Sequence, residues 1–178
     1  MNDINYIFKI SVVGDGRVGK TSLIKKFTQS SFEKEYIKTI GAQLSAYVEE
    51  IDGERIKLLF WDIAGQDTFH FLRPNFSKNS RAAIIVYSLE ENNFGKESFE
   101  HILPWYDDIM KYCGDIPIII IANKADLVDE TKLDNSKIQE FVNENKVYDF
   151  YLTSAKTGQG INEAFDTVID ILYNKYTY

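Results

Sequence analysis

Hydrophobic residues along the chain alternate between short continuous runs and stripes with helical spacing. The runs are rich in β-branched and aromatic residues and predict six strands, at Tyr6–Val13, Ala42–Ile51, Arg55–Asp62, Ala82–Tyr87, Ile116–Ala122 and Val147–Leu152. Two of them, Ala82–Tyr87 and Ile116–Ala122, are almost entirely apolar, as expected of strands buried on both faces. Asp52 and Gly53 separate the second and third strands, and this dipeptide predicts a tight antiparallel hairpin.

Apolar residues spaced three and four apart predict helices between most of these strands. The clear ones are Lys20 to about Gln29, Phe99–Met110, a shorter helix around Ile138–Val142, and Ile161–Leu172. Pro104 should kink the second helix or lie near its start. A fifth helical segment between Gln66 and Asn79 is poorly patterned. The alternation predicts an α/β fold in three layers, with a mostly parallel six-stranded sheet, one antiparallel edge strand and about five flanking helices.

Composition narrows the class of protein. The 178 residues suit one domain over residues 1–178, and 44% hydrophobic with 26% charged residues excludes disorder for most of the chain. Cys113 is the single cysteine, which excludes a disulfide scaffold. A net charge of −7 argues against nucleic-acid binding. The chain carries no membrane-spanning run, no lipidation motif and no basic tail. We therefore expect a soluble cytoplasmic monomer whose membrane association would need partners or a missing tail.

The strongest motif follows the first predicted strand and precedes the first predicted helix. It runs Gly14, Asp15, Gly16, Arg17, Val18, Gly19, Lys20, Thr21 and matches G-x-x-x-x-G-K-[ST], the phosphate loop. Glycines let the backbone wrap a phosphate, and the helix N-terminus adds partial positive charge. Lys20 would reach the β- and γ-phosphates, and the Thr21 hydroxyl would bind Mg²⁺. A chance match is disfavoured by the strand–loop–helix context.

Three weaker motifs follow later strands. Asp62 at the end of the third strand can hold Mg²⁺ through water, Gly65 can bring its N–H close to a γ-phosphate, and Gln66 can orient an attacking water. In Asn123-Lys124-Ala125-Asp126 a carboxylate can accept two hydrogen bonds from guanine, which adenine cannot offer. Ser154-Ala155-Lys156 follows the sixth strand and can place a backbone N–H on guanine O6.

In this order and spacing, the four motifs resemble those of the Ras-superfamily small GTPases, and most closely the Rab group. The resemblance runs from Ile7 to about Leu172 and implies a P-loop NTPase G domain that hydrolyses GTP with Mg²⁺. Tyr36–Gly41 and Gly65 to about Asn79 would be the two switch loops, and Gly16 would leave room for an arginine finger. Residues Leu44, Trp61 and Phe76 occupy the positions of an effector platform. The implied nucleotide-binding set adds Ser22, Phe32, which would stack on guanine, and Thr39, which would bind Mg²⁺ and the γ-phosphate.

Partners implied by this resemblance are an exchange factor, an activating protein and effectors, none identified by the sequence. Two other functions remain open. One is a GTPase-like interaction module of a larger assembly. The other is a P-loop ATPase or small-molecule kinase, which the motif ending at Asp126 argues against. We expect Arg17 and Arg81 to be solvated or structural rather than internal arginine fingers. His70 and His101 share no metal spacing and should be surface or partly packed residues.

Overall fold

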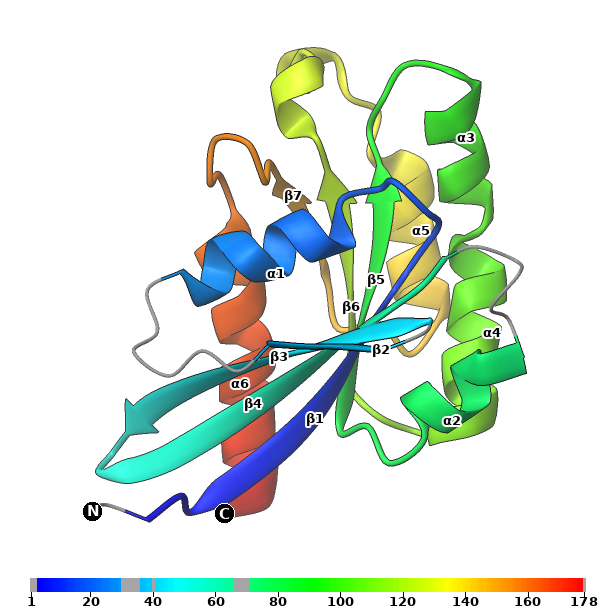
Figure 1. Cartoon of the computed structure of the whole chain (residues 1–178). Coiled ribbons are helices and arrows are strands. Elements are labelled where there is room, and N and C mark those ends of the chain that lie inside the picture. The colour runs from blue at the N-terminus through cyan, green and yellow to red at the C-terminus, as the bar shows by residue number, and fades with distance from the viewer. Residues whose placement is uncertain (1–2, 30–35, 40, 66–70, 178) are drawn as a thin grey trace.

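Seven strands form a single sheet in the computed structural model, which describes residues 3–29, 36–39, 41–65 and 71–177. The strand order is β2-β3-β4-β1-β5-β6-β7, with β1 in the centre (Figure 1). Their bounds are β1 Tyr6–Val13, β2 Tyr36–Thr39, β3 Ala42–Ile51, β4 Glu54–Ile63, β5 Ala82–Ser88, β6 Ile118–Asn123 and β7 Phe150–Thr153. The six predicted strands are therefore present, and β2 is a short additional strand.

Two pairings of the sheet are antiparallel and the rest are parallel. β3 pairs with β4 antiparallel, and the short β2 pairs with β3 in the same way. Ile51 lies opposite Glu54, so Asp52 and Gly53 alone make the turn, with φ angles of 52° and 84°. Positive φ at both positions is the geometry that matches the twist of a two-residue hairpin. The predicted hairpin is thus confirmed, with β2 rather than β3 at the edge.

Helices cover the two faces of the sheet separately (Figure 1). α1 (Lys20–Thr28) and α6 (Ile161–Thr177) pack on one face, around Phe27, Phe60 and Phe165. α4 (Ile102–Cys113) and α5 (Ser136–Glu144) pack on the other, where they bury Ile118 and Ile120 of β6. α2 (Arg73–Ser77) contacts α4 and β4, while α3 (Asn93–Glu100) contacts β5. The three-layer α/β arrangement agrees with the expected fold class.

The predicted helix Phe99–Met110 is two helices joined at His101. α3 ends at Glu100 and α4 begins at Ile102, so Pro104 lies in the first turn of α4. That position needs no intrahelical N–H, which explains why proline is tolerated there. Two 3-10 turns, η2 (Ala125–Leu127) and η3 (Glu130–Lys132), follow β6. Throughout the described ranges, every helix is too short or too polar to span a bilayer.

Candidate functional site

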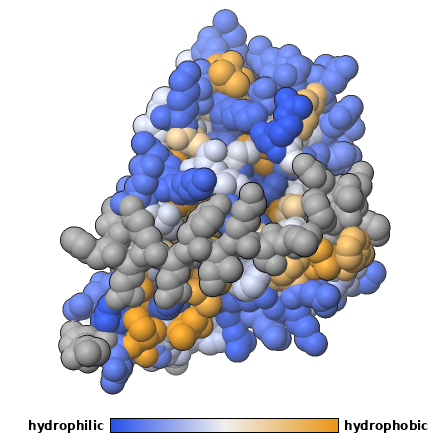
Figure 2. All heavy atoms as spheres, in the orientation of Figure 1, coloured by the Kyte–Doolittle hydropathy of each residue, from blue (hydrophilic) through white to orange (hydrophobic). Residues whose placement is uncertain are grey.

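The sequence motifs meet at one edge of the sheet. β1, β5, β6 and β7 are parallel, β4 runs with β1, and each motif follows the carboxyl end of one of these strands. Because parallel strands end at the same edge, the loops after them converge beside the N-terminus of α1 (Figure 1). Hydrophilic residues cover most of the upper part of this view, where the loops after β5, β6 and β7 lie (Figure 2).

The phosphate loop is held by close backbone contacts that require glycine at two positions. Gly14 has φ 140°, and a Cβ there would lie 2.2 Å from the carbonyl oxygen of Val86. Gly19 has φ 105°, and a Cβ there would lie 2.3 Å from Nδ2 of Asn123. A side chain at Gly14 would displace β5, and one at Gly19 would displace the Asn123 side chain at the end of β6. These glycines therefore fix the loop against both neighbours.

Lys20 lies inside this loop and is 6% exposed. Its Nζ donates to the carbonyl oxygens of Gly14 at 2.8 Å and Asp15 at 2.7 Å. Burial lowers the pKa of Lys20 to about 8, while the nearby carboxylates of Asp62 and Asp15 act in the opposite direction. The ammonium group is therefore costly to desolvate here and gains from additional negative charge, such as a phosphate.

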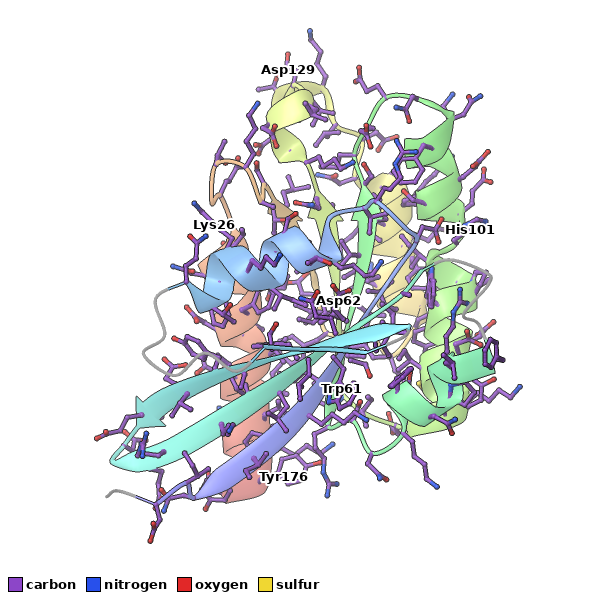
Figure 3. The ribbon with its side chains drawn as sticks, viewed as in Figure 1. Lys26, Trp61, Asp62, His101, Asp129 and Tyr176 are labelled. Atoms are coloured by element: carbon purple, nitrogen blue, oxygen red, sulfur yellow. The ribbon has the colours of Figure 1, made fainter. Side chains whose placement is uncertain are left out.

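Thr21 and Asp62 bring two side-chain oxygens together beside Lys20. The hydroxyl of Thr21 donates to Oδ2 of Asp62, which is 7% exposed and lies at the end of β4 (Figure 3). Burial raises the pKa of Asp62, and the hydrogen bond from Thr21 partly offsets that rise. Hydroxyl and carboxylate oxygens suit Mg²⁺, which takes few protein ligands and completes its shell with waters and phosphates. The donor set therefore fits this metal.

Gly65 packs directly against the phosphate loop. A Cβ at Gly65 would lie 2.2 Å from the carbonyl oxygen of Gly14 and 2.4 Å from the backbone N of Gly16. Only a residue without a side chain can approach the loop this closely. This contact places Gly65, the first residue of the second predicted switch segment, beside the backbone of the phosphate loop.

Asn123 connects three loops of the site. Its Nδ2 donates to the carbonyl oxygen of Val18 at 2.8 Å, and its Oδ1 accepts from the hydroxyl of Thr153 at 3.1 Å and the N–H of Ala155 at 3.2 Å. The residue is 1% exposed. It thereby ties the phosphate loop to the ends of β6 and β7, and it accepts from one backbone N–H of the Ser154–Lys156 motif, that of Ala155.

Asp126 faces a pocket beside the phosphate loop. The hydroxyl of Ser154 donates to its Oδ1 at 2.5 Å, and Nζ of Lys156 lies 3.8 Å from its Oδ2. The pocket has a volume of about 370 Å³ and is lined by the phosphate loop, α1, and the segments after β6 and β7, through Arg17, Gly19, Ser22, Asn123, Lys124, Asp126, Leu127, Ala155 and Lys156. The Asp126 carboxylate in its wall and its position next to the phosphate loop suit a nucleotide base.

Comparison with known proteins agrees with this geometry. The family model described as "Ras family" matches residues 9–174. The chain belongs to the Ras family. It is also 33% identical, over 165 residues that cover 92% of this chain and 77% of the relative, to a protein of Zea mays named "GTP-binding protein YPTM1". As a Rab-like member of this family, the chain is a GTP-binding, GTP-hydrolysing switch with a regulatory or trafficking role. The alternative of an interaction module is not favoured.

Three predicted site residues of this Ras-family chain cannot be placed fully. Phe32 and Gln66 lie outside the described residues, and Thr39 lies in β2 with its side chain outside the description. The other predicted residues converge as described above. Leu44 lies opposite Trp61 across β3 and β4, and Trp61 stacks on Phe76 at 5.6 Å between ring centroids, so the structure also brings the platform residues together.

Sequence reasoning missed the partners of the Asp15 side chain. Nδ1 of His101 lies 2.6 Å from its Oδ2, and the indole N–H of Trp105 donates to its Oδ1 at 2.9 Å. His101 lies at the junction of α3 and α4 (Figure 3). Next to it, the guanidinium of Arg73 lies 3.9 Å from the Trp105 ring. These residues are far apart in sequence and form no motif, so spacing alone gave no signal for this contact.

Proposed function

We propose that this site binds guanine nucleotide with Mg²⁺ through the residues that the motifs single out. The observation that carries the proposal is the buried Lys20, enclosed by the phosphate-loop carbonyls with the Thr21–Asp62 pair beside it. Lys20 would offset charge on the β- and γ-phosphate oxygens, and the backbone from Gly14 to Gly19 would surround the β-phosphate. Asp126 would select guanine, supported by Ser154 and Lys156.

Residues Thr21, Thr39 and Asp62 would hold the metal, the last through water. When bound, Mg²⁺ would neutralise negative charge shared by the β- and γ-phosphates. The close approach of Gly65 to the phosphate loop supports a role for its N–H at the γ-phosphate. Gln66, the next residue, would orient the attacking water, and Phe32 would stack on the base.

Nucleotide state would be communicated by the segments around Tyr36–Gly41 and Gly65–Asn79. Contacts with the γ-phosphate would order them, and hydrolysis would release them. The cluster of Leu44, Trp61 and Phe76 lies next to the second segment and supports a role in effector binding. Exchange factors and activating proteins would set the lifetime of each state; the nucleotide-bound monomer itself would turn over GTP slowly.

The test combines base competition with single-turnover hydrolysis. We expect GTP and GDP to displace a fluorescent GDP analogue while ATP does not, and we expect Mg²⁺-dependent hydrolysis at roughly 10⁻⁴ to 10⁻³ s⁻¹. Gln66→Leu should retain binding and slow hydrolysis by about ten- to 1000-fold, the scale of losing a positioning group. Gln139→Leu, on the exposed side of α5, serves as the matched control. Equal displacement by ATP would refute the assignment of guanine as the base. An unchanged hydrolysis rate in Gln66→Leu would mean that another residue orients the attacking water.

A further inference from the structure

Arg17 has a backbone conformation that residues with a side chain disfavour. Its φ is 71°, in the left-handed region, although it lies within a phosphate loop that uses glycine at Gly14, Gly16 and Gly19. For an ordinary side chain this region is accessible only when surrounding contacts support it. The Arg17 side chain does have such a contact, on α3.

The Phe94 ring contacts two cations that line the nucleotide pocket, Arg17 and Lys124. The guanidinium carbon of Arg17 is 5.4 Å from the centroid of the Phe94 ring, and Nζ of Lys124 is also 5.4 Å from it. Both distances lie within the range of cation–π attraction. Phe94 is partly buried and packs against the hydrophobic core beneath α1. The ring therefore connects the phosphate loop with the base-recognition loop.

Glu90 holds one of these cations in place. Its Oε2 lies 2.6 Å from Nζ of Lys124, and both side chains are about three-quarters buried, with 23% and 25% exposed. The hydrogen bond from Lys124 lowers the pKa of Glu90, and the charge of Arg17 acts in the same direction. Glu90 is therefore a negatively charged carboxylate beside Arg17 and Lys124. Its charge offsets the repulsion between these two cations, which both contact the Phe94 ring.

The start of α3 is built to present Phe94 at this point. Oδ1 of Asn92 accepts from the N–H of Gly95 at 2.9 Å and caps the helix. A Cβ at Gly95 would lie 1.9 Å from the carbonyl oxygen of Glu90, so this turn needs glycine. The turn fixes Phe94 and Glu90 relative to each other.

We propose that Arg17, Glu90, Phe94 and Lys124, together called the clamp, retain bound guanine nucleotide. Arg17 and Lys124 both line the 370 Å³ pocket. Each comes from a different loop and Phe94 contacts both, so moving the two loops apart would break these contacts. The two cations also place positive charge beside an anionic ligand. Phe94 is a positioning residue that acts through both cations, and the inference rests on the proposed function of this same site.

The test measures release of a fluorescent GDP analogue, chased with excess GDP in Mg²⁺ buffer. Phe94→Leu keeps apolar bulk but removes the π face. Each cation–π contact of this kind is worth about two- to 30-fold in an equilibrium constant, so we expect release to be about tenfold faster. Phe94→Tyr keeps the π face and should release within twofold of the wild-type rate. Phe141→Leu removes a partly buried ring from α5 and is the matched control, with release unchanged.

A double-mutant cycle separates the clamp from a general loss of packing. Arg17→Gly removes the cation and relieves the left-handed backbone, and its effect should not add fully to that of Phe94→Leu, because both remove the same contact. Release from Phe94→Leu within twofold of wild type, or equal release from the Tyr and Leu variants, would overturn the inference alone. Failure of the wild-type protein to bind the analogue would overturn the proposed function as well.

Discussion

Replacing Asn123 should damage both folding and the nucleotide site. Its amide makes three hydrogen bonds: two buried ones with the carbonyl of Val18 and the hydroxyl of Thr153, and a partly buried one with the N–H of Ala155. Asn123→Ala leaves those three groups without their partner, at about 1–3 kcal/mol each, and incomplete additivity brings the total to about 3–6 kcal/mol. For a chain of this size, that corresponds to a Tm lower by roughly 6–24 °C.

The assay is thermal unfolding followed by circular dichroism, with and without saturating GDP. The decrease in Tm without added GDP measures the loss of folding stability. A larger decrease in Tm with GDP shows that the variant also binds GDP more weakly. Gln139→Ala removes one exposed hydrogen bond, to Asn143 at 3.3 Å, and should change Tm by less than about 2 °C.

A second variant tests the geometry itself. Asn123→Asp keeps the accepting oxygen but turns a carboxylate oxygen toward the Val18 carbonyl, at a position that is 1% exposed. It should destabilise the protein at pH 7 at least as much as Asn123→Ala, because a buried charge then meets an acceptor. Acidification toward pH 5 should lessen the deficit relative to wild type, because a protonated carboxyl can donate. A folded Asn123→Ala protein within about 1 kcal/mol of wild type would refute the reasoning.

Three further predictions concern single residues. Asp126→Asn should weaken GDP binding by several kcal/mol and improve xanthosine diphosphate binding, because charge-assisted hydrogen bonds are worth about 1.5–3 kcal/mol each. Competition titration measures both affinities. A GDP affinity equal to that of the wild type would mean that Asp126 does not recognise the base. Gly65→Ala should slow single-turnover GTP hydrolysis at least tenfold, because its Cβ would lie 2.2 Å from the Gly14 carbonyl; a wild-type rate would mean that the segment does not need this contact. Burial raises the pKa of Cys113 to about 11, so at pH 8 iodoacetamide should alkylate it about 100-fold more slowly than in urea, with a rate that climbs up to about pH 11; equal rates would contradict a buried thiol.

Much of the fold could be predicted because each element has its own local pattern. The apolar runs of β5 and β6 and the stripe of α6 identify buried strands and a helix without reference to anything else. Boundaries were less accurate: β6 begins at Ile118 rather than Ile116, because Pro117 has no N–H to donate to the ladder. β2 was missed because its four residues become a strand only by pairing with β3.

The site divides in the same way. Residues in contiguous motifs, such as Lys20 and Asp126, could be assigned because the spacing reflects the shape of one loop. Contacts of the phosphate loop with α3 and α4 could not be predicted. Asp15 meets Trp105, and Arg17 meets Phe94, only after the sheet has aligned its strand ends. Arg17 contacts Phe94 of α3, a partner that the sequence did not predict. His101 is half exposed, as predicted, but its contact with Asp15 was not foreseen.

The central position of β1 has a consequence for how the chain is synthesised. β1 leaves the ribosome first, yet it pairs only with β4 and β5, which end at Ile63 and Ser88. At about 5–20 residues per second, its apolar side chains wait on the order of ten seconds for both neighbours. During that time the β3–β4 hairpin, whose pairing is local, is the earliest stable part of the sheet that can form. The nascent chain therefore exposes the apolar residues of its central strand for longest. Substitutions that weaken the hairpin should then lower the yield of folded protein more than its final stability.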